Sequence, residues 1–189
     1  QFIKQVAGLG ITVVGGGIAA ESLLQQVEAA PAPTIVVASN AAPGILTRRA
    51  VDALGGMKRF VKSGNKVVIK PNIGWARKPE EAANTNPDVV TEVIKMCYEA
   101  GAKEVVVFDH PCDTPRISYE MSGIKEAAER ARARVIVNIS DSAYQTIQVP
   151  KGKILKTEDV RVIRDILKSD VFINLPIAKT HGSAQYTVA

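Results

Sequence analysis

The sequence has few cysteines, histidines and aromatic residues: its 189 residues contain two Cys, two His and 5% Phe, Trp and Tyr together. The two cysteines, Cys97 and Cys112, exclude a framework of several disulfides. Together with two histidines they do not complete a closed zinc site of the usual spacing. We therefore expect a fold held together by an ordinary hydrophobic core.

A concentrated charge of one sign is also missing. The 24 basic and 19 acidic residues leave a net charge of +5, which is divided among separate short clusters such as Arg48-Arg49 and Lys58-Arg59. Because no basic stripe carries interleaved aromatic side chains, we expect no nucleic-acid partner. A content of 46% hydrophobic and 23% charged residues excludes a disordered, collagen-like or polytopic membrane protein.

The first thirty residues differ in composition from the rest. Phe2-Ile3-Lys4 is followed by a glycine-rich apolar run from Val6 to Leu24 and then by small residues. This pattern is typical of a targeting segment, and the triplet is similar to the end of a twin-arginine export motif. We predict an export signal or a retained membrane anchor at residues 1–30 and an α/β domain at 31–189. A glycine-rich buried helix or strand–helix turn is the alternative.

Strands and helices are predicted to alternate from residue 34 onward. Short β-branched runs predict strands at residues 34–38, 66–70, 104–108, 134–138 and 170–174. Apolar spacing predicts helices at 46–61 (interrupted at Gly55-Gly56), 87–100, 122–133 and from 157, with a β-hairpin at 145–156. Continuous apolar strands that alternate with helices favour an α/β fold of three layers: a mostly parallel sheet with helices on both faces and one antiparallel hairpin excursion.

The second of these helices has the clearest limits. Asn86 is a typical N-cap residue, Pro87 suits the first helical position, and Gly101 suits the position just past the end. Cys97 lies in the apolar stripe of this helix, so we expect it to be a small core residue.

Polar residues follow three of the predicted strands, where the carboxyl ends of parallel strands form binding sites. We predict that one sheet edge gathers Lys70, Asn72, Asn84, Asn86, Asp109, Lys179 and His181. The lysines and amides favour binding of a small anion or carboxylate, and Asp109 with His181 would supply acid–base or metal-ligand chemistry. Structural roles remain open: Lys70 at the end of a strand in solvent, Asp109 in a turn, and Asn86 as a helix cap. Cys112 is an open candidate for a reactive thiol or an iron ligand.

Several of these segments resemble one bacterial and archaeal family, domain of unknown function 362. The resemblance is carried by VVIKPNIGW at 67–75, ANTNPDVV at 83–90, EAGAKEVVVFD at 99–109, SGI at 122–124 and INLPIAKTHGSA at 173–184. It implies an exported protein, in keeping with the predicted signal, and some relatives carry an added ferredoxin-type domain. This chain has no Cys-x-x-Cys pair, so an iron–sulfur cluster would require a further region or a partner. The family pattern also continues past the KTHG element, which leads us to expect a domain truncated at its carboxyl terminus.

Three function classes follow from these expectations. The first is an accessory subunit on the outer side of the cytoplasmic membrane that binds a small anionic ligand or a redox partner protein. The second is an enzyme acting on a carboxylate-bearing metabolite, with Lys70 and Lys179 as anion clamps and His181 with Asp109 as the acid–base pair. The third is a structural surface protein. The substrate, metal, partner and oligomeric state are not specified by the sequence.

Overall fold

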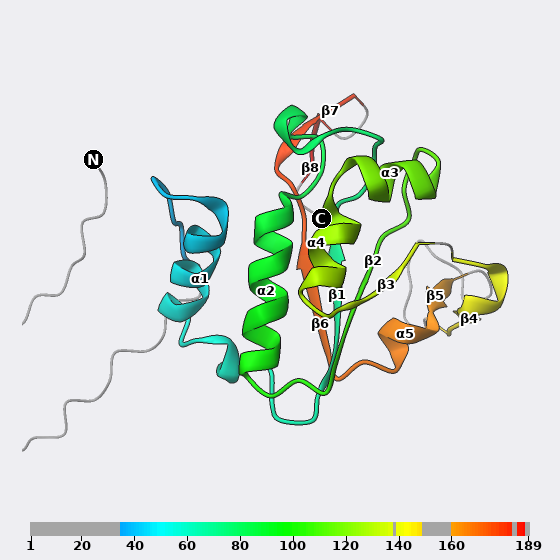
Figure 1. Cartoon of the computed structure of the whole chain (residues 1–189). Coiled ribbons are helices and arrows are strands. Elements are labelled where there is room, and N and C mark those ends of the chain that lie inside the picture. Colours follow the sequence, from blue (N-terminus) through cyan, green and yellow to red (C-terminus); the bar gives the residue numbers. More distant parts are fainter. Residues whose placement is uncertain (1–34, 138, 149–159, 183–184, 188–189) are drawn as a thin grey trace, which may run out of the picture. The chain divides into compact units, whose positions relative to one another are not determined.

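The computed structural model describes residues 35–137, 139–148, 160–182 and 185–187 (Figure 1). The predicted export segment at 1–30 and residues 149–156 of the predicted hairpin lie outside these ranges. Within the described residues, no helix is both long and apolar enough to cross a lipid bilayer.

A parallel sheet of four strands in the order β3-β2-β1-β6 forms the centre of the domain. The strands are β1 (Lys66–Pro71), β2 (Glu104–Phe108), β3 (Arg134–Ile136) and β6 (Val171–Leu175). Val68 of β1 lies between Val106 of β2 and Phe172 of β6. The central strands β1 and β2 are fully buried over Val67–Ile69 and Val105–Val107, which explains their unbroken apolar sequences.

Helices cover both faces of this sheet, as predicted. One face packs against α1 (Pro43–Ala53), α2 (Pro87–Glu99), α3 (Pro115–Met121) and α4 (Ile124–Arg130), whose apolar side chains share the larger core. The other face is covered by α5 (Arg164–Leu167) and an antiparallel pair, β4 (Tyr144–Thr146) with β5 (Arg161–Ile163). These elements confirm a three-layer α/β fold with an antiparallel excursion.

Short elements complete the described part of the chain. They are the 3-10 turns Met57–Arg59, Pro79–Glu81 and Asp141–Ala143, and a small hairpin of β7 (Lys179–His181) with β8 (Gln185–Thr187). The hairpin follows directly on β6 and carries two of the predicted site residues.

The limits of α2 agree with the sequence. The side chain of Asn86 accepts a hydrogen bond of 2.8 Å from the backbone N–H of Asp88, and Pro87 begins the helix. Gly101 follows its end with a φ of +97°, a left-handed conformation that favours glycine.

Three expected elements differ from the structure. Residues 35–38 form neither helix nor strand in the structure, so the described part of the strand expected at 34–38 is not among the paired strands of this sheet. The helix expected from residue 157 gives way to strand β5 and the short α5, because Ile163 is buried against Val68 and Val106 on the second face. The strand that pairs with β4 is β5, whereas the expected hairpin paired residues 145–149 with 154–156, which lie outside the described residues.

Two further differences concern helices. The helix expected at 46–61 ends at Ala53, and a separate 3-10 turn follows Gly55-Gly56, where both glycines have positive φ. Helix α3 was not predicted, because Pro115–Met121 contains little of the apolar spacing on which helix prediction depends.

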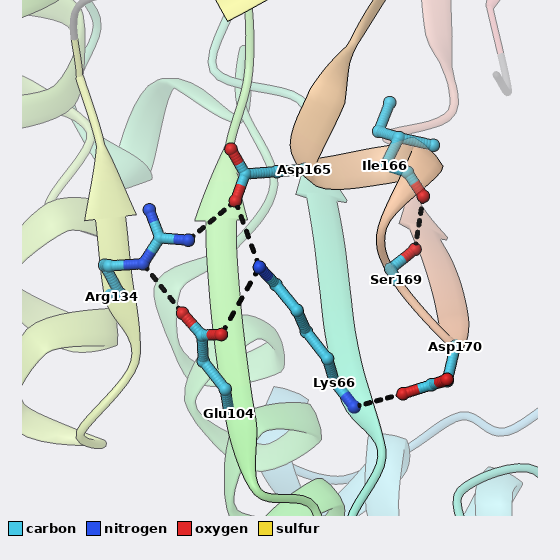
Figure 2. A network of polar contacts seen from close by, with 7 residues as sticks. All are labelled: Lys66, Glu104, Arg134, Asp165, Ile166, Ser169 and Asp170. Carbon is cyan, nitrogen blue, oxygen red and sulfur yellow. Dashed lines mark hydrogen bonds and ion pairs between the residues drawn. The ribbon is translucent and has the colours of Figure 1, made fainter.

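A network of charges joins the amino ends of the strands (Figure 2). Arg134 contacts Glu104 at 2.8 Å and Asp165 at 2.6 Å, and the ammonium of Lys66 lies 3.4 Å from the same two carboxylates. The carboxylate of Asp170 accepts a 2.7 Å hydrogen bond from the backbone N–H of Lys66. The network links α5 to the sheet at the edge opposite the predicted site.

Candidate functional site at the carboxyl edge of the sheet

The direction of the strand order reverses between β1 and β6, and we call the place beyond the carboxyl ends of these two strands the crevice. The chain steps from β1 to β2 to β3 in one direction, whereas β6 lies on the other side of β1. Ligands of open parallel sheets bind beyond the carboxyl ends of the strands, where the direction reverses in this way. Asn72 follows β1 at this point, and Lys179 begins the hairpin that follows β6.

Lys179 reaches across this crevice. Its ammonium donates hydrogen bonds to the side-chain oxygen of Asn72 (3.1 Å) and to the carbonyl oxygen of Ala83 (2.7 Å). An ammonium group has three N–H donors, so these two bonds leave one for a ligand. The structure therefore brings together two residues that are 107 positions apart in the sequence and that were both predicted for the site.

The charge of Lys70 is already matched within the protein. Its ammonium lies 2.8 Å from one carboxylate oxygen of Asp109. The other oxygen of Asp109 accepts a hydrogen bond of 2.6 Å from the backbone N–H of Ile73. Asp109 is only 4% exposed, and a buried carboxylate requires such partners. Asp109 and Lys70 thus form an ion pair that joins the ends of β1 and β2.

Tyr119 of α3 holds the backbone beside this ion pair. Its hydroxyl accepts the N–H of Asp109 at 2.6 Å and lies 3.0 and 2.9 Å from the carbonyl oxygens of Asp109 and Ile136. Burial is the main cause that raises the pKa of Tyr119, and the charge of Asp109 adds to it, so the hydroxyl stays neutral. Sequence analysis missed Tyr119 because its helix was not predicted and the contact spans two strands.

The amides predicted at 84 and 86 serve the local structure. The side chain of Asn84 accepts from the N–H of Trp75 (3.2 Å) and donates to the carbonyl oxygens of Trp75 (2.8 Å) and Arg77 (3.3 Å). Its hydrogen bonds therefore fold the loop after β1, while Asn86 caps α2. Any ligand contact by either side chain stays a prediction.

Thr85 is a second residue that the sequence did not point to. Its hydroxyl accepts the N–H of Asn72 at 2.8 Å and donates to the carbonyl oxygen of Leu175 at 2.6 Å. It thereby bridges β1 and β6 where they separate. A threonine between two asparagines shows no sign of this role in the sequence.

Burial is the main influence on the pKa of Lys179. Removal from water lowers the pKa of its ammonium, and the nearby Cys112 and Asp109 oppose this shift only in part. None of the ion pairs among the described residues includes Lys179. Lys70 and Asp109 pair with each other, so the ammonium of Lys179 is the site lysine whose charge no described carboxylate pairs with directly.

Comparison with known proteins gives the chain a family. The model of the domain of unknown function 362 (DUF362) matches residues 67–189, which include every residue of the predicted site. The chain belongs to this family. The match confirms the resemblance carried by the sequence segments, and the site described above lies within the DUF362 domain.

A relative of this DUF362 protein is the thylakoid-associated protein sll1697 of the cyanobacterium Synechocystis. The two are 29% identical over 141 residues, which cover 75% of this chain and 42% of that protein. The chain thus matches less than half the length of this relative. No solved structure matches the chain with statistical significance.

The remaining candidates of the DUF362 domain lie near the same edge. His181 is exposed at the end of β7, two residues beyond Lys179, so both lie on the same face of that strand. Cys112 is exposed, and its N–H donates to the carbonyl oxygen of Gly74 at 2.9 Å. An open hollow of about 230 Å³ lies beside Asp109 and His110. Within the described ranges, no group of three or more His, Cys, Asp or Glu is placed to hold a metal ion.

Proposed function

We propose that this DUF362 domain binds a small anion, a carboxylate in the first instance, at the crevice between β1 and β6. The observation that carries the proposal is the ammonium of Lys179, which is partly buried and whose hydrogen bonds within the described residues go to neutral oxygens of Asn72 and Ala83. A cation desolvated in this way gains from an anionic partner, because attraction between charges is stronger where water is partly excluded.

The neighbouring groups support binding rather than proton transfer. Both carboxylate oxygens of Asp109 are engaged, one by Lys70 and one by the N–H of Ile73. An aspartate held in this way positions the loop and the lysine. The pairing of Asp109 with His181 as acid and base therefore stays a prediction.

The first experiment measures binding of acetate and phosphate by isothermal titration calorimetry, with neutral acetamide as the matched non-ionic ligand. We expect acetate to bind more tightly than acetamide. Lys179→Gln should weaken acetate binding at least tenfold, about 1.4 kcal/mol, because the charge is lost while the side chain can still donate to Asn72. Lys168→Gln at the exposed end of α5 is the control and should bind as the wild type does.

The pH dependence provides a second readout. Burial lowers the pKa of Lys179 below the ordinary lysine value of 10.5, so the ammonium loses its proton at a lower pH than an exposed lysine would. Anion affinity should therefore be complete below that lowered pKa and fall as the pH rises through it. Equal affinity of the wild type and Lys179→Gln at neutral pH would refute the site.

We further propose that the domain acts as an accessory subunit that is exported or membrane-tethered and linked to a redox assembly. The name of the thylakoid-associated relative supports membrane association, and the pattern of residues 1–30 supports export. An iron–sulfur cluster would be supplied by a further region or a partner.

Cell fractionation tests this setting. The chain with residues 1–30 should enter the membrane or periplasmic fraction, whereas the chain without them should remain in the cytoplasm. A cytoplasmic location of both forms would show that export is wrong and would leave the anion site untouched.

A further inference from the structure

The outer edge of β6 is an unfilled place in the sheet. Among the described residues, β6 pairs with β1 alone. In a parallel ladder, backbone groups alternate between the two neighbours of a strand, so part of the β6 backbone faces away from β1. An edge of this kind accepts a further strand unless something covers it.

An apolar groove runs along this edge. It has a volume of about 400 Å³ and is lined by Val171–Leu175 of β6, by Thr47, Ala50 and Val51 of α1, and by Met57, Phe60 and Val93. Phe60 and Phe172 are each 44% exposed. Residues of α1 and of β6 both line the groove. It therefore lies between α1 and the strand that α1 covers.

The segment that precedes α1 has the chemistry to fill the groove. Residues 35–38 read Ile-Val-Val-Ala and have no strand partner in the described chain. The side chains of Ile35 and Val37 are 81% and 84% exposed, while those between and after them are partly covered. This alternation suits a strand, and β-branched residues favour one.

The handedness of the fold specifies where such a strand belongs. The crossovers from β1 to β2 and from β2 to β3 pass over the face covered by α2 and α4 and step toward β3. Parallel crossovers are right-handed in nearly all proteins, so every crossover on this face steps in the same direction. Because α1 lies on this face and leads to β1, the strand before it belongs on the β6 side of β1. With β6 already beside β1, the free position is the outer edge of β6.

We infer that residues 35–38 dock on the outer edge of β6 of the same molecule as a fifth, parallel strand. The four residues Ser39–Ala42 are a normal length for a loop between a strand and a helix, about 2–6 residues. Within this loop, Asn40 has a left-handed φ of +65°, a conformation that asparagine adopts more readily than most residues. Docking removes Ile35 and Val37 from water and covers the exposed edge.

Hydrogen exchange of the whole chain, followed by mass spectrometry, tests this inference. We expect the amides of residues 35–38, and part of those of β6, to exchange at least tenfold more slowly than in an unstructured peptide. Replacing both Ile35 and Val37 by Asp should abolish this protection at both places. Ile45→Asp changes a half-exposed isoleucine of α1 outside the groove, and it should leave the protection intact.

These variants distinguish a docked segment at residues 35–38 from a segment that leaves the outer edge of β6 open. If the edge stays open, Ile35 and Val37 remain in water, and their replacement by Asp would leave unchanged both the hydrogen exchange of β6 and the midpoint of urea unfolding. That result would overturn the inference. Asn40→Gly gives the backbone of the loop more freedom, so hydrogen exchange at residues 35–38 should become faster while that of the core stays slow. Protection that appears only in a dimer, judged by light scattering at several concentrations, would show strand exchange between copies and would also overturn it.

Discussion

The hydroxyl of Tyr119 should contribute strongly to stability, because it satisfies buried backbone groups of two strands. A hydroxyl has one hydrogen and two lone pairs. Here it accepts the N–H of Asp109 and directs its hydrogen to the carbonyl oxygens of Asp109 and Ile136. Tyr119 itself is 0% exposed and Asp109 4%. In Tyr119→Phe the buried N–H of Asp109 loses this partner.

Leaving a buried donor or acceptor unsatisfied costs about 1–3 kcal/mol. The midpoint of thermal unfolding should therefore fall by about 2–4 °C for each kcal/mol in a domain of this size. Urea unfolding followed by far-UV circular dichroism gives the difference in the free energy of unfolding.

Tyr98→Phe is the matched control for this substitution. Its hydroxyl donates a single 2.8 Å hydrogen bond to the carbonyl oxygen of Arg132 in an exposed setting. We expect its removal to cost less than about 0.5 kcal/mol. If both variants unfold at the same urea concentration as the wild type, the argument that Tyr119 links the ends of β2 and β3 is wrong.

Three further predictions concern other parts of the domain. Arg134 lowers the pKa of Glu104 below its ordinary value of 4.5, so the ionised carboxylate stabilises the fold above pH 4.5 and this effect is lost as the pH falls through the lowered pKa. In Glu104→Gln the urea midpoint should therefore depend less on pH between pH 7 and pH 3 than in the wild type. Gly101→Ala should lower the urea midpoint more than Gly56→Ala. Both glycines have a positive φ, but only the Cβ added at Gly101 would lie 3.0 Å from a backbone atom. Ellman's reagent should label only Cys112 in the native chain, because the second thiol is buried and its pKa is raised to about 12.

The sequence by itself determined the central strands, the best-marked helix and the edge of the sheet at which candidate residues meet. Residues 67–69 and 105–108 are apolar throughout because both faces of β1 and β2 are covered, and such a run is recognisable without the fold. The limits of α2 depend on Asn86, Pro87 and Gly101, whose effects act within one helical turn. Parallel strands end at one edge, so the meeting of Asn72 with Lys179 also followed from the strand pattern.

Only the tertiary structure decided how the polar residues are used. Asn84, Asn86 and Asp109 have the same donor and acceptor groups in a binding site as in a loop, a helix cap or an ion pair, and their partners come from the folded chain. The roles of Thr85 and Tyr119 were invisible because their hydroxyls bond backbone atoms of distant strands.

The same reason accounts for the misplaced elements. Residues 161–163 fit a helix by local spacing and became β5, because pairing with β4 and burial of Ile163 on the second face contribute more than helix propensity. Residues 35–38 fit a strand by local spacing, but a strand forms only where a neighbour satisfies its backbone, and the neighbour we infer for this segment is the outer edge of β6. Local patterns specify what a segment can become, and the contacts available across the sheet decide which of these forms it takes.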